Sequence, residues 1–255
     1  MKNIKTLLLC AVALLAVSCQ SHQMRIMSYN IRIGIGMDNK TDLQRAADVI
    51  TRVNPDFVGL QEVDSVAERS GWVDQAKALG EMTGMHYIFA PALERSKGLY
   101  GIAALVKEKP LAVRNIHLPG QEEVRTFLVL EYDDYLLCNT HFSLVADSRK
   151  ESVEIIRQVI SEYDKPAIIT GDFNMLPTSE ECHKMDEMWK PLSDTTRFTS
   201  PANGATRAID YIWGREGYEY DVKYYEVVDG LQPGEKVITS SYDNFGENEV
   251  LILHK

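Results

Sequence analysis

The chain has 255 residues and a formal net charge of −10 at pH 7, with 37 acidic and 27 basic residues. No block of basic residues relieves this charge, which argues against a long polynucleotide as partner, because sequence-tolerant nucleic-acid binding normally needs a basic stripe. A hydrophobic content of 45% supports one large domain or two small ones, and the lack of a linker or internal repeat favours one.

Residues 1–18 have the pattern of a bacterial lipoprotein signal peptide. A basic start is followed over residues 7–17 by an apolar run of secretory length, too short to span a bilayer. Small residues then precede Cys19, as in a lipobox, although an ordinary cleaved signal with an incidental cysteine is the alternative. We expect an exported protein, lipid-anchored at Cys19 to a membrane of the bacterial cell envelope, with residues 19–255 as a single monomeric domain.

Strands and helices alternate along the rest of the chain. Apolar and alternating runs predict strands over residues 24–31, 57–60, 87–89, 102–106, 111–116, 126–132, 136–139, 166–170, 209–213, 222–227 and 250–253. Helical spacing predicts helices over residues 41–53, 72–82, 148–163 and 180–188, the first with Thr41 as N-cap. A hairpin turn is predicted at Asp133-Asp134, and free buried thiols at Cys138 and Cys182. This order predicts mixed sheets with helices outside, an α/β or α+β layered domain.

The most informative stretch is Gly171-Asp172-Phe173-Asn174, which follows the predicted strand over residues 166–170. A carboxylate and a carboxamide two residues apart can hold a hard cation or position water, although Asp and Asn also form turns and caps. Other predicted strands also end in polar residues: Asn30, Glu62, His141, Asp210 and Asp243. Because ligand sites gather where strand ends converge, these positions predict a functional site.

The residue types in this set suggest metal-assisted phosphoryl chemistry. The donors form an all-oxygen set: Asn30, Glu62, Asp172, Asn174 and Asp243. Such donors suit Mg²⁺, Mn²⁺ or Ca²⁺ and do not suit structural zinc. We expect Asp172 to orient or deprotonate an attacking water and His141 to donate a hydrogen bond or a proton to the phosphate. For His141, a satisfied buried histidine is the alternative.

These motifs resemble the endonuclease/exonuclease/phosphatase family of metal-dependent phosphoesterases. The matching stretches, in the family's order, are residues 28–32, 60–63, 100–101, 139–141, 171–174 and 209–212. The resemblance implies an α/β (α+β) four-layer sandwich of two mixed β-sheets flanked by helices. It also implies that Asn30, Glu62 and Asp243 bind the cation, with Glu62 as the main ligand. The further roles it implies are catalytic for Tyr100, His141, Asp172, Asn174 and Asp210 and substrate-binding for Arg125.

The chain departs from the family pattern near its C-terminus. Relatives carry Ser-Asp-His there, whereas Asp243 is followed by Asn244 in this chain. An amide can hydrogen-bond a phosphate oxygen but cannot take a proton at neutral pH, and Asp210 would lose its imidazole partner. Three hypotheses follow: an exported metal-dependent phosphoesterase, a catalytically degenerate binding lipoprotein that keeps Asn244 as a substrate contact, and an extracellular nuclease, which the acidic charge disfavours.

Overall fold

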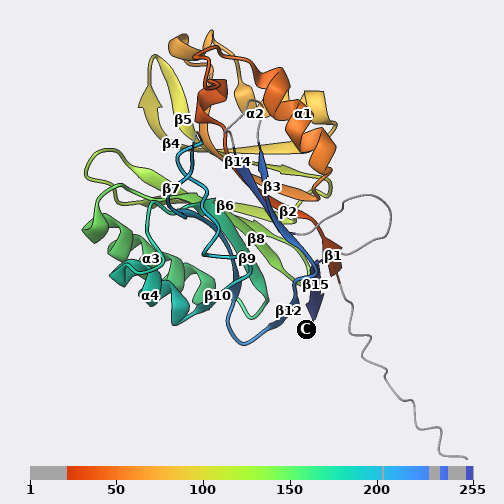
Figure 1. Cartoon of the computed structure of the whole chain (residues 1–255), viewed down its shortest axis with the longest axis vertical. Coiled ribbons are helices and arrows are strands. Elements are labelled where there is room, and N and C mark those ends of the chain that lie inside the picture. The colour runs from red at the N-terminus through yellow and green to blue at the C-terminus, as the bar shows by residue number, and fades with distance from the viewer. Residues whose placement is uncertain (1–21, 203, 230–235, 241–250, 255) are drawn as a thin grey trace, which may run out of the picture.

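The computed structural model describes residues 22–202, 204–229, 236–240 and 251–254. Two six-stranded mixed sheets lie face to face, with helices on their outer faces (Figure 1). In order across the first sheet, the strands are β10 (Trp189–Pro191), β11 (Asp210–Arg215), β9 (Ala167–Asp172), β8 (Leu136–His141), β7 (Arg125–Glu131) and β6 (Ala112–Leu118). The second sheet has the order β13 (Tyr225–Asp229), β14 (Lys236–Ser240), β2 (Ile26–Asn30), β3 (Phe57–Ser65), β5 (Gly98–Val106) and β4 (His86–Arg95).

Four α-helices cover the outer faces, and a small third sheet lies at one end. Helices α1 (Leu43–Val53) and α2 (Gln75–Thr83) pack on the second sheet, and α3 (Ala146–Ser161) and α4 (Glu180–Asp186) pack on the first (Figure 1). The third sheet pairs β1 (His22–Met24), β15 (Leu251–His254) and β12 (Glu219–Asp221). Two single-turn 3₁₀ helices are η1 (Arg32–Gly34) and η2 (Glu68–Ser70).

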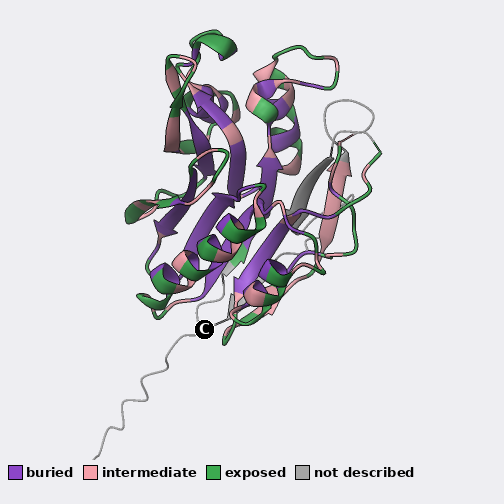
Figure 2. Cartoon of the chain, turned by 90° about the vertical axis from the view of Figure 1, so that its left-hand side faces the viewer, coloured by how far each residue is buried: buried purple, intermediate pink, exposed green. Residues whose placement is uncertain are grey.

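Alternation along the central strands produces the four layers. Ile26 faces the core between the sheets, whereas its neighbour Met27 faces the core beneath α1 and α2. Ile168 and Ile169 divide in the same way between the inter-sheet core and the core beneath α3 and α4. Successive strand residues point to opposite faces, so a strand covered on both faces is apolar throughout. Figure 2 shows the resulting pattern, with buried strands inside and exposed residues on the outer helix faces.

The predicted fold is confirmed, with local differences. All four predicted helices form, but α1 is capped by Asp42, whose side chain accepts the Gln44 N–H at 3.0 Å, and not by Thr41. Strand β3 continues past Leu60 to Ser65, so Glu62 lies within a strand and not beyond its end. The short strands β10, β12 and β14 were not predicted, because three to five residues carry too little periodicity.

Asn139 fastens the two sheets together directly beneath the polar strand ends. Its Nδ2 donates to the carbonyls of Leu60 and Ala103, each at 2.9 Å, and its Oδ1 accepts from Gln61 Nε2 at 2.7 Å. Gly59 permits this close approach, because a Cβ there would lie 2.6 Å from Asn139 Oδ1. The relative position of the two sheets is therefore fixed by specific hydrogen bonds at this level.

Two further properties concern the cysteines and the helices. Cys138 and Cys182 are free and buried, as predicted, and burial raises the pKa of both thiols. Within the described ranges, no helix has both the length and the apolar character that crossing a membrane requires. Cys19 lies outside the described residues.

Candidate active site

Three neighbouring strands of the first sheet place three predicted site residues side by side. His141, at the end of β8, is the register partner of Asp172, at the end of the parallel strand β9. Asp172 in turn pairs with Asp210, the first residue of the antiparallel strand β11. Strand order thus converts three positions far apart in the sequence into one row at the end of the sheet.

The second sheet contributes Asn30 and Glu62. Asn30 ends β2, and Glu62 lies in β3 at a bulge, where the register with β5 shifts between Leu60 and Val63. The φ angle of Glu62 is 54°, in the left-handed region that side-chain-bearing residues rarely adopt. Bulges re-aim side chains and are frequent next to active sites. The strained backbone of Glu62 thus fits a functional position.

The Asn30 amide links one carboxylate from each sheet. Its Nδ2 donates to Glu62 Oε1 at 2.9 Å and to Asp172 Oδ2 at 3.1 Å. Its Oδ1 accepts the Arg32 N–H at 3.0 Å. Two carboxylates that are 110 residues apart in the sequence are thereby held within hydrogen-bonding distance of a single nitrogen atom.

Asp172 and Asn174 form a tight turn directly after β9. The Asn174 N–H donates to Asp172 Oδ1 at 3.1 Å, and Asn174 has a left-handed φ of 49°. Asn174 Nδ2 donates to the Phe142 carbonyl at 3.0 Å, which fixes the amide in the cleft. Burial, reinforced by the charge of Glu62, raises the pKa of Asp172 to about 6 despite the hydrogen bond from Asn30.

His141 is buried between Arg125 and Asp172. Arg125 Nη1 lies 3.2 Å from His141 Nδ1 and 3.4 Å from Nε2, so it can donate to whichever ring nitrogen is unprotonated, and Nε2 is 3.8 Å from Asp172 Oδ2. Burial, with the nearby Arg125 charge, lowers the pKa of His141 to about 3. The guanidinium of Arg125 is itself held by Glu122 at 3.1 Å and Glu123 at 2.9 Å, and Arg125, predicted to bind substrate, is not among the described residues that line the cleft.

Tyr100 lies beside the cleft and does not line it. Its buried ring is covered by Arg69 at 5.0 Å and Arg95 at 5.6 Å from the ring centroid, as in cation–π pairs. Burial, together with the charge of Glu62, raises the pKa of the Tyr100 hydroxyl. Tyr100 therefore stays protonated and can act only as a hydrogen-bonding group.

Asp210 has a partner that the sequence did not indicate. Thr199 Oγ1 donates to Asp210 Oδ2 at 2.6 Å and accepts the backbone N–H groups of Ile209 and Asp210. Desolvation and the neighbouring Asp172 raise the pKa of Asp210 well above its usual range. Thr199 belongs to the irregular segment after β10, where no periodic pattern marks individual residues.

Side chains from both sheets line a cleft of about 430 Å³. Five predicted residues lie in it together: Asn30, Glu62, Asp172, Asn174 and Asp210. The cleft also contains Arg32 and Arg207, which sequence reasoning did not assign to the site. The predicted Asp243 and Asn244 lie outside the described residues.

The donor chemistry of the cleft fits a divalent cation. Within the described ranges, no group of three or more His, Cys, Asp or Glu side chains is arranged to hold a metal. Glu62 and Asp172 nevertheless share the Asn30 amide, and burial, together with the charge of Glu62, raises the pKa of Asp172. A hard cation would offset this negative charge, and carboxylate oxygens are its preferred ligands.

Comparisons with known proteins agree with this geometry. A family model, the Endonuclease/Exonuclease/phosphatase family, matches residues 27–227. No curated protein matches. Similar solved structures include a family protein from Bacteroides thetaiotaomicron, with 18% identity, a TM-score of 0.68, and coverage of 93% of this chain and 97% of that one.

Two further structures share the fold. A Bacteroides thetaiotaomicron mannosyl-6-phosphatase has 19% identity and a TM-score of 0.64, with 86% of this chain and 98% of that chain covered. The human nocturnin catalytic domain with bound sulfate anion has 17% identity and a TM-score of 0.62, with 92% and 96% covered. At these identities the structures show a common fold, and the family match spans most of the sequence. The chain belongs to the endonuclease/exonuclease/phosphatase family.

Proposed function

We propose that the protein is an exported, divalent-metal-dependent phosphoesterase that hydrolyses a phosphodiester or a phosphomonoester. The observation that carries the proposal is the Asn30 amide, which holds Glu62 and Asp172 at 2.9 and 3.1 Å. This contact gathers two carboxylates from separate sheets at the end of an enclosed cleft. Repulsion between the carboxylates is costly for the fold alone, so the arrangement favours a role in binding and catalysis.

The cleft supplies groups for each part of phosphoester hydrolysis. Glu62, with Asp243 outside the described residues, would hold Mg²⁺, Mn²⁺ or Ca²⁺, which would stabilise negative charge on the phosphoryl and leaving-group oxygens. Asp172 is positioned to orient a water and accept its proton. The ring N–H of neutral His141 and the amide of Asn174 would donate hydrogen bonds to phosphate oxygens.

The relatives support a phosphate-like ligand. One solved structure of this fold is a mannosyl-6-phosphatase, and another has sulfate bound. A phosphatase activity in the one and a bound sulfate in the other are both compatible with a cleft of this composition. The cleft volume of about 430 Å³ favours a small phosphoester over a nucleic-acid duplex for our chain, in keeping with its acidic charge.

The export and lipid-anchor parts of the proposal rest on residues 1–19. In the native host, wild-type protein is expected in the detergent-extractable membrane fraction, and Cys19→Ala in the soluble fraction or retained as precursor. Cys10→Ser, inside the signal sequence, is the matched control and is expected to behave as wild type. Membrane retention of a Cys19→Ala protein from which the signal peptide has been removed would argue against lipid anchoring through this residue.

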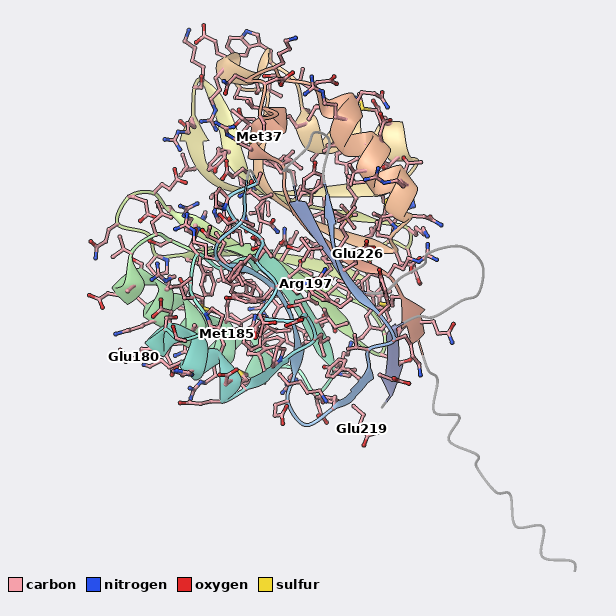
Figure 3. The ribbon with its side chains drawn as sticks, in the orientation of Figure 1. Met37, Glu180, Met185, Arg197, Glu219 and Glu226 are labelled. Atoms are coloured by element: carbon pink, nitrogen blue, oxygen red, sulfur yellow. The ribbon has the colours of Figure 1, made fainter. Side chains whose placement is uncertain are left out.

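A substrate panel tests the enzymatic part. Purified protein is assayed with 4-nitrophenyl phosphate, bis(4-nitrophenyl) phosphate and duplex DNA, with Mg²⁺, Mn²⁺ or Ca²⁺. We expect turnover of a small ester and none of DNA, and a loss of about 10²–10⁴-fold in Asp172→Asn. Glu219→Gln, an exposed change in β12, is the control for charge alone (Figure 3).

The alternative is a degenerate binding protein, and Asn244 in place of the family histidine favours it. Under that alternative, wild type would show only background rates in every assay, and Asn244→His would gain activity. Turnover by wild type that Asp172→Asn abolishes would exclude it. Preferential cleavage of DNA would instead support the extracellular nuclease hypothesis.

A further inference from the structure

Two arginines in the cleft have no ion-pair partner. Arg32 and Arg207 both line the cleft, and neither side chain has a hydrogen bond or salt bridge with any described residue. Other arginines of this acidic chain are held by carboxylates, for example Arg45 by Asp38 and Arg69 by Asp64. Arg32 and Arg207 are therefore available to a ligand of the cleft, since no described carboxylate holds them.

Both arginines project from backbone that is fixed. The Arg32 N–H is held by Asn30 Oδ1 at 3.0 Å, and its φ is 47°, so the left-handed conformation is maintained by a residue of the site itself. Arg207 is paired with Ser200 in both directions, through bonds of 3.0 and 3.1 Å. The two arginine side chains are exposed, but the backbone from which each extends is fixed by hydrogen bonds, in two different segments that line the cleft.

The cleft is lined by both positive and negative groups. Glu62, Asp172 and Asp210 line the same cavity, yet none of them forms a salt bridge with Arg32 or Arg207 among the described residues. Apolar side chains, including Met37 and Pro201, also line the cleft. The cleft therefore combines carboxylates, an apolar wall and unpaired guanidinium groups. It is complementary to a ligand with two negative groups: a cation-bound phosphoryl group, which would face the carboxylates, and a second anion, which would face the arginines.

We propose that Arg32 and Arg207 form a second anion subsite, which binds a carboxylate or phosphate on the leaving-group side of the substrate. The inference rests on the proposed function, because it assigns the scissile phosphate to the end of the cleft where Glu62 and Asp172 lie. It narrows the substrate class to small phosphoesters with an additional anionic group. Guanidinium groups suit this role, since their planar donors match carboxylate and phosphate oxygens.

Matched ligands test the subsite. Glycerol 3-phosphate and 3-phosphoglycerate share a carbon skeleton and differ in a terminal hydroxymethyl or carboxylate, and glycerol 1,3-bisphosphate provides the phosphate arm. Binding is measured by calorimetry with Mn²⁺ in an Asp172→Asn background, which suppresses turnover. We expect the two ligands with a second anion to bind about fivefold or more tightly than glycerol 3-phosphate.

Arginine variants in that background identify the groups responsible. Arg207→Gln and Arg32→Gln are each expected to remove most of the preference and to leave glycerol 3-phosphate binding within twofold. Arg197→Gln is the matched control, because Arg197 is exposed in the same segment as Arg207 but does not line the cleft, and it should keep the preference (Figure 3).

The remaining outcomes distinguish failure of the subsite from failure of the proposed catalytic function. Equal binding of all three ligands, no binding of any, or a preference that survives both arginine changes would overturn the subsite. A uniform loss for all ligands would also overturn it, because the arginines would then contact the scissile phosphate. If the preference is present but the unmutated protein shows no turnover of any ester, the subsite stands and the proposed catalytic function fails.

Discussion

Burial shifts the pKa values of Asp172 and its neighbour His141 in opposite directions. The pKa of Asp172 is raised to about 6 and that of His141 is lowered to about 3, in both cases chiefly by burial. At neutral pH, Asp172 is ionised and His141 is uncharged. The pair is therefore suited to proton acceptance by the carboxylate and hydrogen-bond donation by the imidazole, and His141 is not available as a general acid.

The charge state of His141 can be observed directly. In metal-free protein, its ring resonances in ¹H–¹⁵N NMR are expected to stay those of a neutral imidazole from pH 8 to pH 5. The unfolded chain has the ordinary pKa of 6.5, so it binds more protons than the native state between that value and about 3. Native stability contributed by His141 is therefore lost as the pH falls below 6.5. A titration midpoint near 6.5 in the folded protein would contradict this.

The pKa shift of Asp172 has the opposite sign to that of His141 and gives a second prediction. Its pKa is higher in the folded than in the unfolded state, so the ionised carboxylate destabilises metal-free protein above pH 6, and the cost is relieved between pH 6 and its ordinary pKa of 3.8. Asp172→Asn is expected to raise stability at pH 7 by about 1–2 kcal/mol while abolishing activity.

Thermal unfolding checks the Asp172 prediction under three conditions. The stability difference between Asp172→Asn and wild type should be largest at pH 7 in EDTA, and it should shrink both at pH 4.5 and on addition of Mn²⁺. A variant that is less stable than wild type at pH 7 in EDTA would show that Asp172 contributes more to the fold through its hydrogen bonds than it costs as a charge.

At the scale of elements, Asn139 connects the strands that carry the site. The residue is fully buried, and its amide makes hydrogen bonds to Leu60, Ala103 and Gln61 in the opposite sheet. Asn139→Ala would leave these buried groups unsatisfied, so we expect a loss of about 3 kcal/mol in urea unfolding. Gln158→Ala, at an exposed amide of α3, should cost less than about 1 kcal/mol. Similar losses for the two variants would remove Asn139 as the link between the sheets.

Elements were predictable where a long pattern or a specific motif marks them. The helix of residues 41–53 shows clear amphipathic spacing, yet Asp42 and Thr41 are both good N-caps, and only the backbone geometry selects Asp42. The bulge at Glu62 could not be predicted from a single sequence, because the strand pattern does not show where the register shifts. Thr199 and Arg207 were missed since they lie in an irregular segment.

At the scale of the whole molecule, the sequence predicted which residues meet but not how they touch. The order of strands and helices, with polar residues at strand ends, was sufficient for the layered fold and for a shared site. That Asn30 presents its nitrogen to Glu62 and Asp172 depends on the packing of two sheets, which no local pattern encodes. That no described carboxylate pairs with Arg32 or Arg207 likewise depends on the packed structure and not on a local sequence pattern.

The central claim is that Glu62 and its neighbours bind a divalent cation that phosphoester hydrolysis requires. The most direct measurement is the rate of phosphoester hydrolysis by EDTA-treated protein during titration with Mn²⁺, in wild type, Glu62→Gln and the exposed control Glu219→Gln. The account predicts saturable Mn²⁺ activation in wild type and Glu219→Gln, and a loss of about 10²-fold or more in Glu62→Gln at the same Mn²⁺. Undiminished hydrolysis in EDTA, or full Mn²⁺ activation of Glu62→Gln, would contradict it.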